Sequence, residues 1–555
     1  MKNRTFEPQF ITVLKEGYSL SRFANDLLAG IIVGIVSLPL SIAFAIASGV
    51  KPEQGLITGV IAGFIISALS GSRVQIGGPT GAFIIIVFGI VQQYGYNGLA
   101  MATFMAGVML IIMGFARLGD AIKYIPYPVT VGFTSGIALV IFTTQIPDLF
   151  GLTIAKTPTH FVDKWVACFQ HLPTTNFFAL ALGAMTILII LVFPKITSRV
   201  PGPIVAIFAA TALAQGFHLP VDTIASRFGE VPNRFPAPAF PHFTMDEFSK
   251  LFQPALTIAL LAGIESLLSA VVADGMLGSR HRSNMELVGQ GVANLFSPLF
   301  GGIPATGAIA RTATNIKNGG RTPVAGIISA ITLLLIFLFC GQWAGLIPMS
   351  ALAGILIVVA YNMSEIHLFQ RLLKSQRSDI LVLLFTFGLT VLVDLTVAIE
   401  VGVVLAAFLF MHNMAKMTNI FLVEDDTNGR PHEYDGVPKG VEIFEINGPF
   451  FFGAADKFRD TMAEIEKMPK VLILQMRHVP AIDATAVSVL ESLVVQAHKG
   501  GTQVIFAGVN KRVFKAMRHT DLLERVGIEN ILPDVELALA QAVAIIDAEK
   551  EKKGS

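Results

Sequence analysis

Fourteen apolar segments follow one another through the chain as far as residue 414, separated by charged residues or by Gly and Pro. They lie near residues 24–50, 55–70, 79–93, 97–116, 127–147, 175–193, 201–218, 254–277, 283–299, 305–316, 322–341, 348–361, 378–393 and 396–414. Of the 555 residues, 53% are hydrophobic and only 14% are charged, a composition typical of polytopic α-helical membrane proteins rather than of large soluble enzymes. Several segments are shorter than the roughly 20 residues of a simple span, which is expected where helices are broken or tilted among others.

The charges of the loops predict the orientation of these segments. With the N-terminus placed in the cytoplasm, Lys and Arg gather in every second loop, whereas the short loops near 94–97, 297–304 and 342–348 have none. This is the positive-inside pattern, and it fits fourteen segments with both termini cytoplasmic. The first apolar run lacks a small-x-small cleavage site, so we interpret it as an uncleaved span. Seven segments per half is an odd number, so the two halves are inverted in the membrane.

Two short motifs of similar sequence occur at the third segment of each half: GGPTGA at 77–82 and GGIPATGA at 301–308. Proline is tolerated where a helix begins, threonine supplies a hydroxyl, and glycine lets a ligand approach the backbone. Free N–H groups and the positive end of the helix dipole then favour an anion. The candidate anion-binding residues are Thr80, Gly81, Ala82, Ala305, Thr306 and Gly307.

Small residues in such motifs also occur where helices merely pack closely, and this is the alternative to a binding site. Two observations favour binding here. The motif is repeated in matching positions of the two halves, and the inversion lets the two helix starts meet near the midplane, as in inverted-repeat transporters. The sequence therefore predicts a two-sided anion site between the halves.

Glu265 is the most informative charged residue, because it lies within the apolar run QPALTIALLAGIESLLSAVV. An uncompensated carboxylate there is costly unless it is protonated or faces a polar cavity, so Glu265 is a candidate proton carrier. Ser269 follows one helical turn later and is positioned to share a proton or cation site with it. The alternative is a structural acid bonded to a neighbouring helix.

Three further residues are candidates for the anion site. Arg311, in AIARTATN, either adds positive charge near the anion or extends to the cytoplasmic surface beside Lys317. Leu40 and Phe44, in LPLSIAF, are possible walls of the pocket, although an aromatic at this spacing also fits ordinary helix packing.

The composition changes after the last apolar segment. Residues 417–440 form a polar linker, and residues 441–549 alternate strand-like stretches such as KVLILQM and TQVIFAGV with helix-like ones. This organisation predicts an N-terminal cytoplasmic segment 1–23, a transmembrane domain 24–416 with repeats at about 24–218 and 254–414, a cytoplasmic α/β domain 441–549, and a polar tail 550–555.

Taken together, these stretches resemble the SulP/SLC26 anion transporters, with a STAS domain at the C-terminus. The resemblance rests on GIIVGIVSLPLSIAFAIASGVKPEQGL with GGPTGAF, on GIESLLSAVVADGM with GGIPATGAIARTATN, and on the C-terminal part. Around ELVGQGVANLFSPLFGGI and VAYNMSEIH the sequence is similar to bacterial C4-dicarboxylate transporters. The resemblance implies a core domain and a gate domain, an anion held between the third and tenth helices, an acid on the eighth helix that couples transport to protons or sodium, and a homodimer in the bacterial inner membrane.

The STAS resemblance places Thr485 where some anti-sigma factor antagonists carry a phosphorylated serine, and it implies a cytoplasmic protein partner. The usual Asp-Ser-Ser/Thr-Gly motif reads Asp483-Ala484-Thr485-Ala486 here, so we favour a simpler role in which Asp483 caps the following helix.

Other classes of function have little support in the sequence. The net charge of +1 argues against nucleic acid as a partner, and no Walker loop, G-x-S-x-G or H-E-x-x-H motif indicates an enzyme. Cys168 and Cys340 have no metal-type spacing, so we expect inert thiols and no metal or cofactor.

The sequence therefore predicts a secondary transporter that takes up a small inorganic or organic anion, with H+ as the coupling ion and Na+ as the alternative. C4-dicarboxylates are the first expected substrate and sulfate or bicarbonate the second. An uncoupled anion channel and a membrane-anchored signalling protein with STAS as its output are the competing functions.

Overall fold

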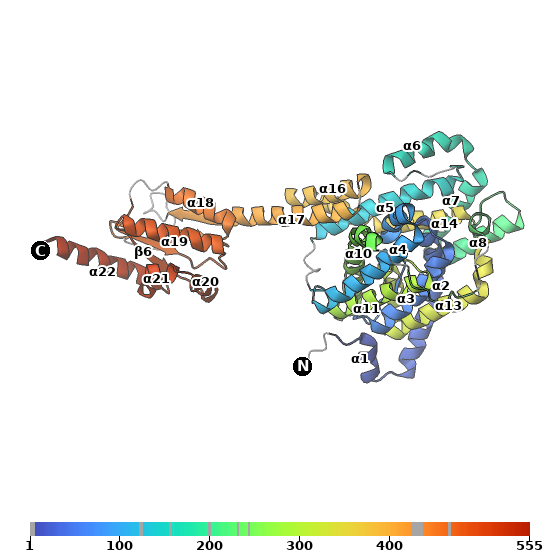
Figure 1. Ribbon diagram of the computed structural model, residues 1–555, viewed down its shortest axis with the longest axis horizontal. Coiled ribbons are helices and arrows are strands. Elements are labelled where there is room, and N and C mark those ends of the chain that lie inside the picture. Colours follow the sequence, from blue (N-terminus) through green and yellow to red (C-terminus); the bar gives the residue numbers. More distant parts are fainter. Residues whose placement is uncertain are drawn as a thin grey trace. The chain divides into compact units, whose positions relative to one another are not determined.

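The computed structural model describes residues 6–120, 126–154, 158, 160–197, 201–229, 232, 234–241, 245–393, 395–422, 437–463 and 468–554. Its backbone divides into two compact units, residues 1–403 and 404–555, which are treated separately below. Figure 1 shows the two units as a helical body and a smaller α/β body.

The first unit consists almost entirely of helices. Those of its first half are α1 (Gln9–Lys15), α2 (Leu20–Ala47), α3 (Pro52–Leu69), η1 (Gly81–Phe83), α4 (Ile84–Phe115), α5 (Tyr127–Phe150), α6 (Phe161–His171), η3 (Leu172–Thr174), α7 (Phe177–Ile196), α8 (Gly202–Gly216) and α9 (Ile224–Phe228). Those of its second half are α10 (Met245–Leu277), α11 (Ser283–Phe296), η4 (Pro298–Phe300), α12 (Ile309–Lys317), α13 (Pro323–Ala344), α14 (Met349–Met363), α15 (Ile366–Leu372), α16 (Arg377–Leu392) and the first part of α17 (Leu395–Met417), whose residues from 404 on belong to the second unit.

Each of the fourteen predicted apolar segments is helical. Two of them are merged in α4, where Gly95 has φ 68° and ψ −175° and interrupts the helix between the third and fourth segments. In the described part of the chain, nine helices are long and apolar enough to cross a membrane. The others include the shorter helices α11 and α12, as the broken segments predicted.

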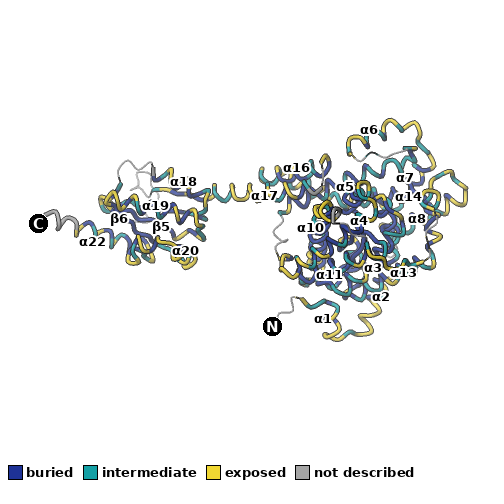
Figure 2. Tube along the Cα trace, in the orientation of Figure 1, coloured by how far each residue is buried: buried dark blue, intermediate teal, exposed yellow. Residues whose placement is uncertain are grey.

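The helices pack as two bundles, in agreement with the expected core and gate domains. In one bundle α11 packs on α4, and α13 packs on α2 and α3; in the other, α14 and α16 pack on α5, and α7 packs on α8 and α14. Buried residues fill the middle of the unit, drawn in dark blue in Figure 2.

The contact between α4 and α11 is unusually close because glycines face each other across it. A Cβ atom added to Gly107 would lie 2.7 Å from the carbonyl oxygen of Gly291, and one added to Gly291 would lie 2.7 Å from that of Gly107. Only glycine at both positions lets the two backbones touch, as in other membrane helix pairs with small residues.

The second unit is a five-stranded mixed sheet with helices on its faces. Its strands are β3 (Asn419–Leu422), β4 (Val441–Asn447), β5 (Val471–Gln475), β6 (Gln503–Ala507) and β7 (Ile531–Leu532), in the order β3-β4-β5-β6-β7, with only β3 antiparallel to its neighbour. Its helices are α18 (Phe452–Ala463), α19 (Ala484–Lys499), α20 (Lys511–Met517), α21 (Leu522–Val526) and α22 (Val535–Gly554), with η5 (Ile528–Asn530). The three central strands and the two main helices agree with the prediction, and β3 begins where a polar linker was expected. Most of that linker lies outside the described residues.

Asp483 caps helix α19 as predicted. Its Oδ1 accepts a hydrogen bond from the N–H of Ala486 at 2.8 Å, and its Oδ2 accepts one from the N–H of Phe452 at 3.0 Å. One carboxylate thereby joins the starts of α18 and α19, while Thr485 is exposed in the first turn of α19.

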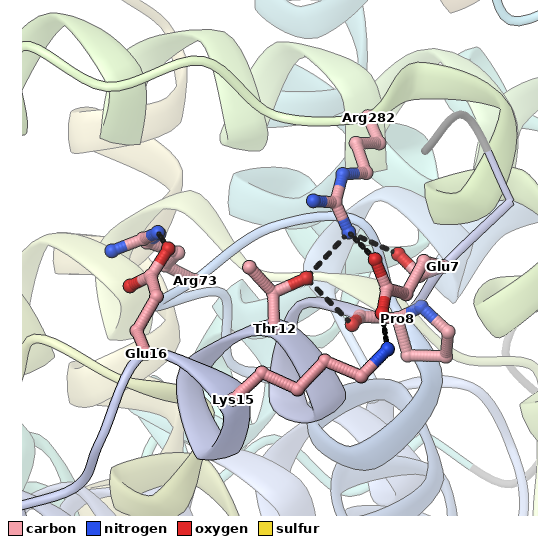
Figure 3. A network of polar contacts seen from close by, with 7 residues as sticks. All are labelled: Glu7, Pro8, Thr12, Lys15, Glu16, Arg73 and Arg282. Atoms are coloured by element: carbon pink, nitrogen blue, oxygen red, sulfur yellow. Dashed lines mark hydrogen bonds and ion pairs between the residues drawn. The ribbon is translucent and has the colours of Figure 1, made fainter. Parts of the chain in front are cut away.

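The N-terminal helix α1 is fastened to the loop between α10 and α11 by Arg282 (Figure 3). The guanidinium donates hydrogen bonds to the carbonyl oxygen of Glu7 and, at 2.9 Å, to Oγ1 of Thr12. Lys15 forms an ion pair with the Glu7 carboxylate, and the N–H of Gln9 donates to the carbonyl oxygen of Ser70 at 3.0 Å. The helix is therefore a docked part of the unit.

We predict that Arg282→Ala releases α1. Each hydrogen bond from a charged group is worth about 1.5–3 kcal/mol, and 1.4 kcal/mol corresponds to a tenfold change in population. The rate of tryptic cleavage after Lys15, followed by mass spectrometry, should therefore rise at least about tenfold. Arg280→Ala removes a neighbouring exposed arginine and serves as the control. Equal cleavage rates in the two variants would contradict this role of Arg282.

Candidate functional site

The two duplicated motifs meet as a pair of antiparallel strands in the middle of the unit. β1 (Gly77–Gly78) pairs with β2 (Thr306–Gly307), with Gly77 opposite Gly307 and Gly78 opposite Thr306. The N–H of Ala308 donates to the carbonyl oxygen of Ile76 at 2.8 Å, which extends the pairing. Because the strands are antiparallel, the helices that follow them, α4 and α12, leave in opposite directions. This geometry agrees with the predicted inverted repeats.

Buried side chains from neighbouring helices pair with the irregular backbone beside these strands. Asn294 of α11 accepts from the N–H of Ala305 at 2.9 Å and donates to the carbonyl oxygen of the same residue at 2.8 Å. Oγ1 of Thr58 accepts from the N–H of Ile303 at 2.7 Å, and Oγ1 of Thr312 accepts from the N–H of Ile76 at 3.0 Å. Such backbone is stable within a membrane only where the protein supplies these partners.

On the α4 side, the candidate residues lie at a helix start. The hydroxyl of Thr80 donates to Oε2 of Glu265 at 3.0 Å. Gly81 and Ala82 belong to the first turn, η1, where no preceding helical carbonyl is available to their N–H groups. These two N–H groups have the position that an anion-binding helix start requires.

On the α12 side, the candidate residues precede the helix. The N–H of Ala305 is taken by Asn294, and the fully buried Thr306 donates its hydroxyl to the carbonyl oxygen of Ala262 at 2.9 Å. The helix begins at Ile309, and Ile309 and Ala310 are exposed. Since the N–H of Ala308 donates to Ile76, the N–H groups of α12 that lack helical acceptors are those of residues 309–311, three to five residues after Thr306.

Glu265 and Arg311 place opposite charges on the two sides of the paired strands. Arg311 is 2% exposed, and its Nη2 donates to the carbonyl oxygen of Pro79 at 2.7 Å, so the side chain turns into the protein and does not extend to the cytoplasmic surface. Glu265 is partly accessible and interacts electrostatically with Arg311 without forming a direct ion pair. The arginine thereby ties α12 to the start of α4.

Ser269 is fully buried one turn beyond Glu265 on α10. Its hydroxyl donates to Oγ1 of Thr312 at 3.4 Å, so its hydrogen-bond partner lies on α12 and is not the Glu265 carboxylate. The structure thus places Ser269 in the contact between α10 and α12.

Apolar side chains from both bundles surround Gly81. A Cβ atom added there would lie 3.4 Å from Phe44 of α2, 3.3 Å from Ile141 of α5 and 2.9 Å from the sulfur of Met363 of α14. Leu40 is buried in the same apolar cluster as Phe44. The sequence had indicated Leu40 and Phe44 but not Ile141 and Met363, because these two lie within uniformly apolar runs.

A polar stripe on α11 supports the site and was missed by the sequence analysis. Glu286, Gln290 and Asn294 are all fully buried. Glu286 accepts from the amide of Gln290 and from that of Gln75, both at 2.9 Å. Gln75 in turn fills the space beside Gly307, where a Cβ atom would lie 1.8 Å from its Nε2. The four-residue spacing of three polar side chains in a short helix was the available signal.

Comparisons with known proteins agree with this architecture. Residues 23–386 match the model of the sulfate permease family, and residues 435–538 match the STAS domain. The chain belongs to the sulfate permease family. It is 44% identical over 514 residues to the Bacillus subtilis protein named "Putative sulfate transporter YvdB", covering 92% of this chain and 96% of that protein. It is 31% identical over 546 residues to the "Bicarbonate transporter BicA" of Picosynechococcus, covering 94% of each.

Solved structures of the family share the fold. The structure of SLC26A9 matches with a TM-score of 0.86 at 19% sequence identity, covering 99% of this chain and 94% of that one. The transmembrane domain of a cyanobacterial BicA matches with a TM-score of 0.62 at 31% identity, covering 69% of this chain and 98% of that one. The protein is accordingly an anion transporter of the SulP/SLC26 family, a multi-pass membrane protein and not an enzyme.

We predict that Asn294→Ala destabilises the site. It leaves the N–H and the carbonyl of Ala305 without their partner in a buried region, at a cost of about 1–3 kcal/mol for each group. The thermal unfolding midpoint of the purified protein should fall by several degrees. Asn318→Ala is the matched control, because among the described residues the Asn318 side-chain amide donates only to the carbonyl of Thr314, one turn back at the end of α12. Equal midpoints for the two variants would argue against the role of Asn294.

Proposed function

We propose that the protein is a secondary active transporter that couples inward movement of a small oxyanion to protons, with Glu265 as the proton-binding group. The observation that carries the proposal is the crossover, by which we mean the paired strands β1 and β2 together with the starts of α4 and α12 that follow them. Two helix starts, one buried arginine and one carboxylate converge there, and the carboxylate lies beside the first of the free N–H groups through its bond with Thr80.

The charges at the crossover give the coupling a physical basis. With Glu265 ionised, the side-chain charges of Glu265 and Arg311 cancel. With Glu265 protonated, Arg311 contributes one positive charge, and each helix start adds about half an elementary charge. The site then balances up to about two negative charges on a bound anion. Protonation and anion binding therefore favour one another, which is the requirement for symport.

The substrate proposed first is sulfate. It carries two negative charges and suits a site built from N–H donors and a guanidinium. The 44% identical relative bears a sulfate transporter's name. C4-dicarboxylates carry the same charge and are the second candidate, on the sequence resemblance around residues 286–303 and 359–367. Bicarbonate is the third, on the name of the 31% identical relative.

The bundle that carries the crossover is proposed to move against the bundle of α5, α7, α8, α14 and α16. Their contact at the site is apolar, since Gly81 faces Ile141 and Met363 there. On the positive-inside pattern, the protein is proposed to lie in a bacterial inner membrane with both termini in the cytoplasm. A homodimer and a cytoplasmic protein partner for the STAS domain complete the proposal.

We predict that Glu265→Gln abolishes the response of uptake to an inward proton gradient. The variant keeps the shape and polarity of the side chain but cannot release a proton. Uptake driven by the gradient should fall at least tenfold in proteoliposomes, while counterflow of labelled anion at equal pH continues.

Glu400→Gln is the matched control, because Glu400 is an exposed acid within the apolar helix α17. Proton-driven uptake that is unchanged in Glu265→Gln would remove Glu265 from the coupling mechanism.

We predict that purified protein in proteoliposomes accumulates labelled sulfate when the outside is acidic. Succinate and bicarbonate, tested in parallel under separate proton and sodium gradients, identify the other candidates. Accumulation that follows only sodium would contradict proton coupling. Anion currents in a planar bilayer at rates far above those of a carrier would instead show a channel.

A further inference from the structure

A buried lysine stands between the anion site and one face of the membrane unit. Lys164 belongs to α6, which packs on α5 and α16. Figure 1 shows α6 at the edge of the unit. Lys164 is only 6% exposed, and its Nζ lies 5.3 Å from the centre of the Phe88 ring. Among the residues that the structure describes, no carboxylate forms an ion pair with it.

Phe88 connects this lysine to the crossover. It belongs to α4 and follows Gly81 by seven residues, which corresponds to about 10 Å along a helix. At the level of Gly81, α4 faces Ile141 of α5. We call the contact between α4 and the bundle that contains α5 the seam. Lys164 is held on the bundle of α5 and contacts α4 at Phe88, farther along this seam. A solute passing between the bundles from the α6 face reaches Lys164 before it reaches Gly81.

The chemistry of Lys164 indicates an anionic ligand. Burial lowers the pKa of its ammonium group, and the electrostatic interaction with Cys168 acts in the opposite direction. The Phe88 ring compensates only part of the lost hydration. A helix face that merely packs would use an apolar residue, as α6 does one turn later with the buried Cys168. The group that would offset the unpaired charge is an anion.

We propose that Lys164 is an outer anion-binding residue, which receives the transported oxyanion on the α6 face before it reaches Arg311. The inference rests on the proposed transport function. When the seam is closed, as here, the ammonium rests on the Phe88 ring. When the bundles separate on this face, the ammonium leaves the ring and pairs with the incoming anion.

The test compares Lys164→Met with Lys164→Arg in the full-length protein, reconstituted in one orientation. Methionine keeps the apolar stem and removes the charge, whereas arginine keeps both the charge and the contact with the ring. In Lys164→Met, the KM for labelled sulfate added on the α6 face should rise at least fivefold, while the KM from the opposite face stays within twofold. Lys164→Arg should stay within twofold of the wild type on both faces.

Phe88→Leu separates anion capture from packing. It removes the ring but leaves the ammonium, so the KM on the α6 face should not rise. An unchanged KM in Lys164→Met, or an equal rise on both faces, would overturn the proposal, and so would an equal rise in Phe88→Leu. If Lys164→Met does not fold, a raised KM on the α6 face in Phe88→Leu alone decides against it. Failure of the wild type to transport any tested anion would instead refute the proposed function.

Discussion

A backbone that turns in the middle of a bilayer must find its hydrogen-bond partners within the protein or face a polar cavity, and the membrane unit is arranged around this requirement. The strands β1 and β2 satisfy some of these backbone groups by pairing with each other. Side chains from three different helices satisfy further backbone groups: Asn294, Thr58 and Thr312. The stripe of buried polar side chains on α11 follows from the same need, because Glu286 holds Gln75 and Gln75 fills the space beside Gly307. In lipid an unpaired peptide group costs several kcal/mol, so these contacts are conditions for the turn to exist.

The same turn creates the chemistry that is proposed for the site. A helix interrupted at mid-depth exposes N–H groups that a continuous helix would use internally. At α4 those groups lie beside a carboxylate, and at α12 the helix carries an arginine back to the start of α4. Support of the fold and attraction of an anion are therefore two results of one local geometry, which explains why polar side chains are concentrated here in a chain that is only 14% charged.

The sequence predicted the fourteen helical segments because apolar length depends on composition alone, and it predicted the crossover because the motif occurs twice. It placed the free N–H groups of the second motif too early, since the N–H of Ala305 is taken by Asn294, which lies on another helix, and α12 begins only at Ile309. The sequence left the direction of the Arg311 side chain open, because its hydrogen-bond partner Pro79 is far from it in the sequence. Ile141 and Met363 gave no signal within uniformly apolar runs, and the short edge strands β3 and β7 were missed because they are set by their neighbours rather than by their own pattern.

The glycine contact between α4 and α11 has a mechanical consequence. With no side chain between the two backbones, there is no soft layer to compress. The hydrogen bonds of Glu265 with Thr80 and of Arg311 with Pro79 fix α10 and α12 to the start of α4. The boundary between the bundles near Gly81 is of the opposite kind, since Ile141 and Met363 meet Gly81 only through apolar surfaces that have no bond direction to preserve. The first bundle is rigid inside, and its apolar contact with the second bundle has no preferred direction. Relative motion therefore occurs by sliding at this contact, beside the helix starts, and leaves the hydrogen bonds at the helix starts intact.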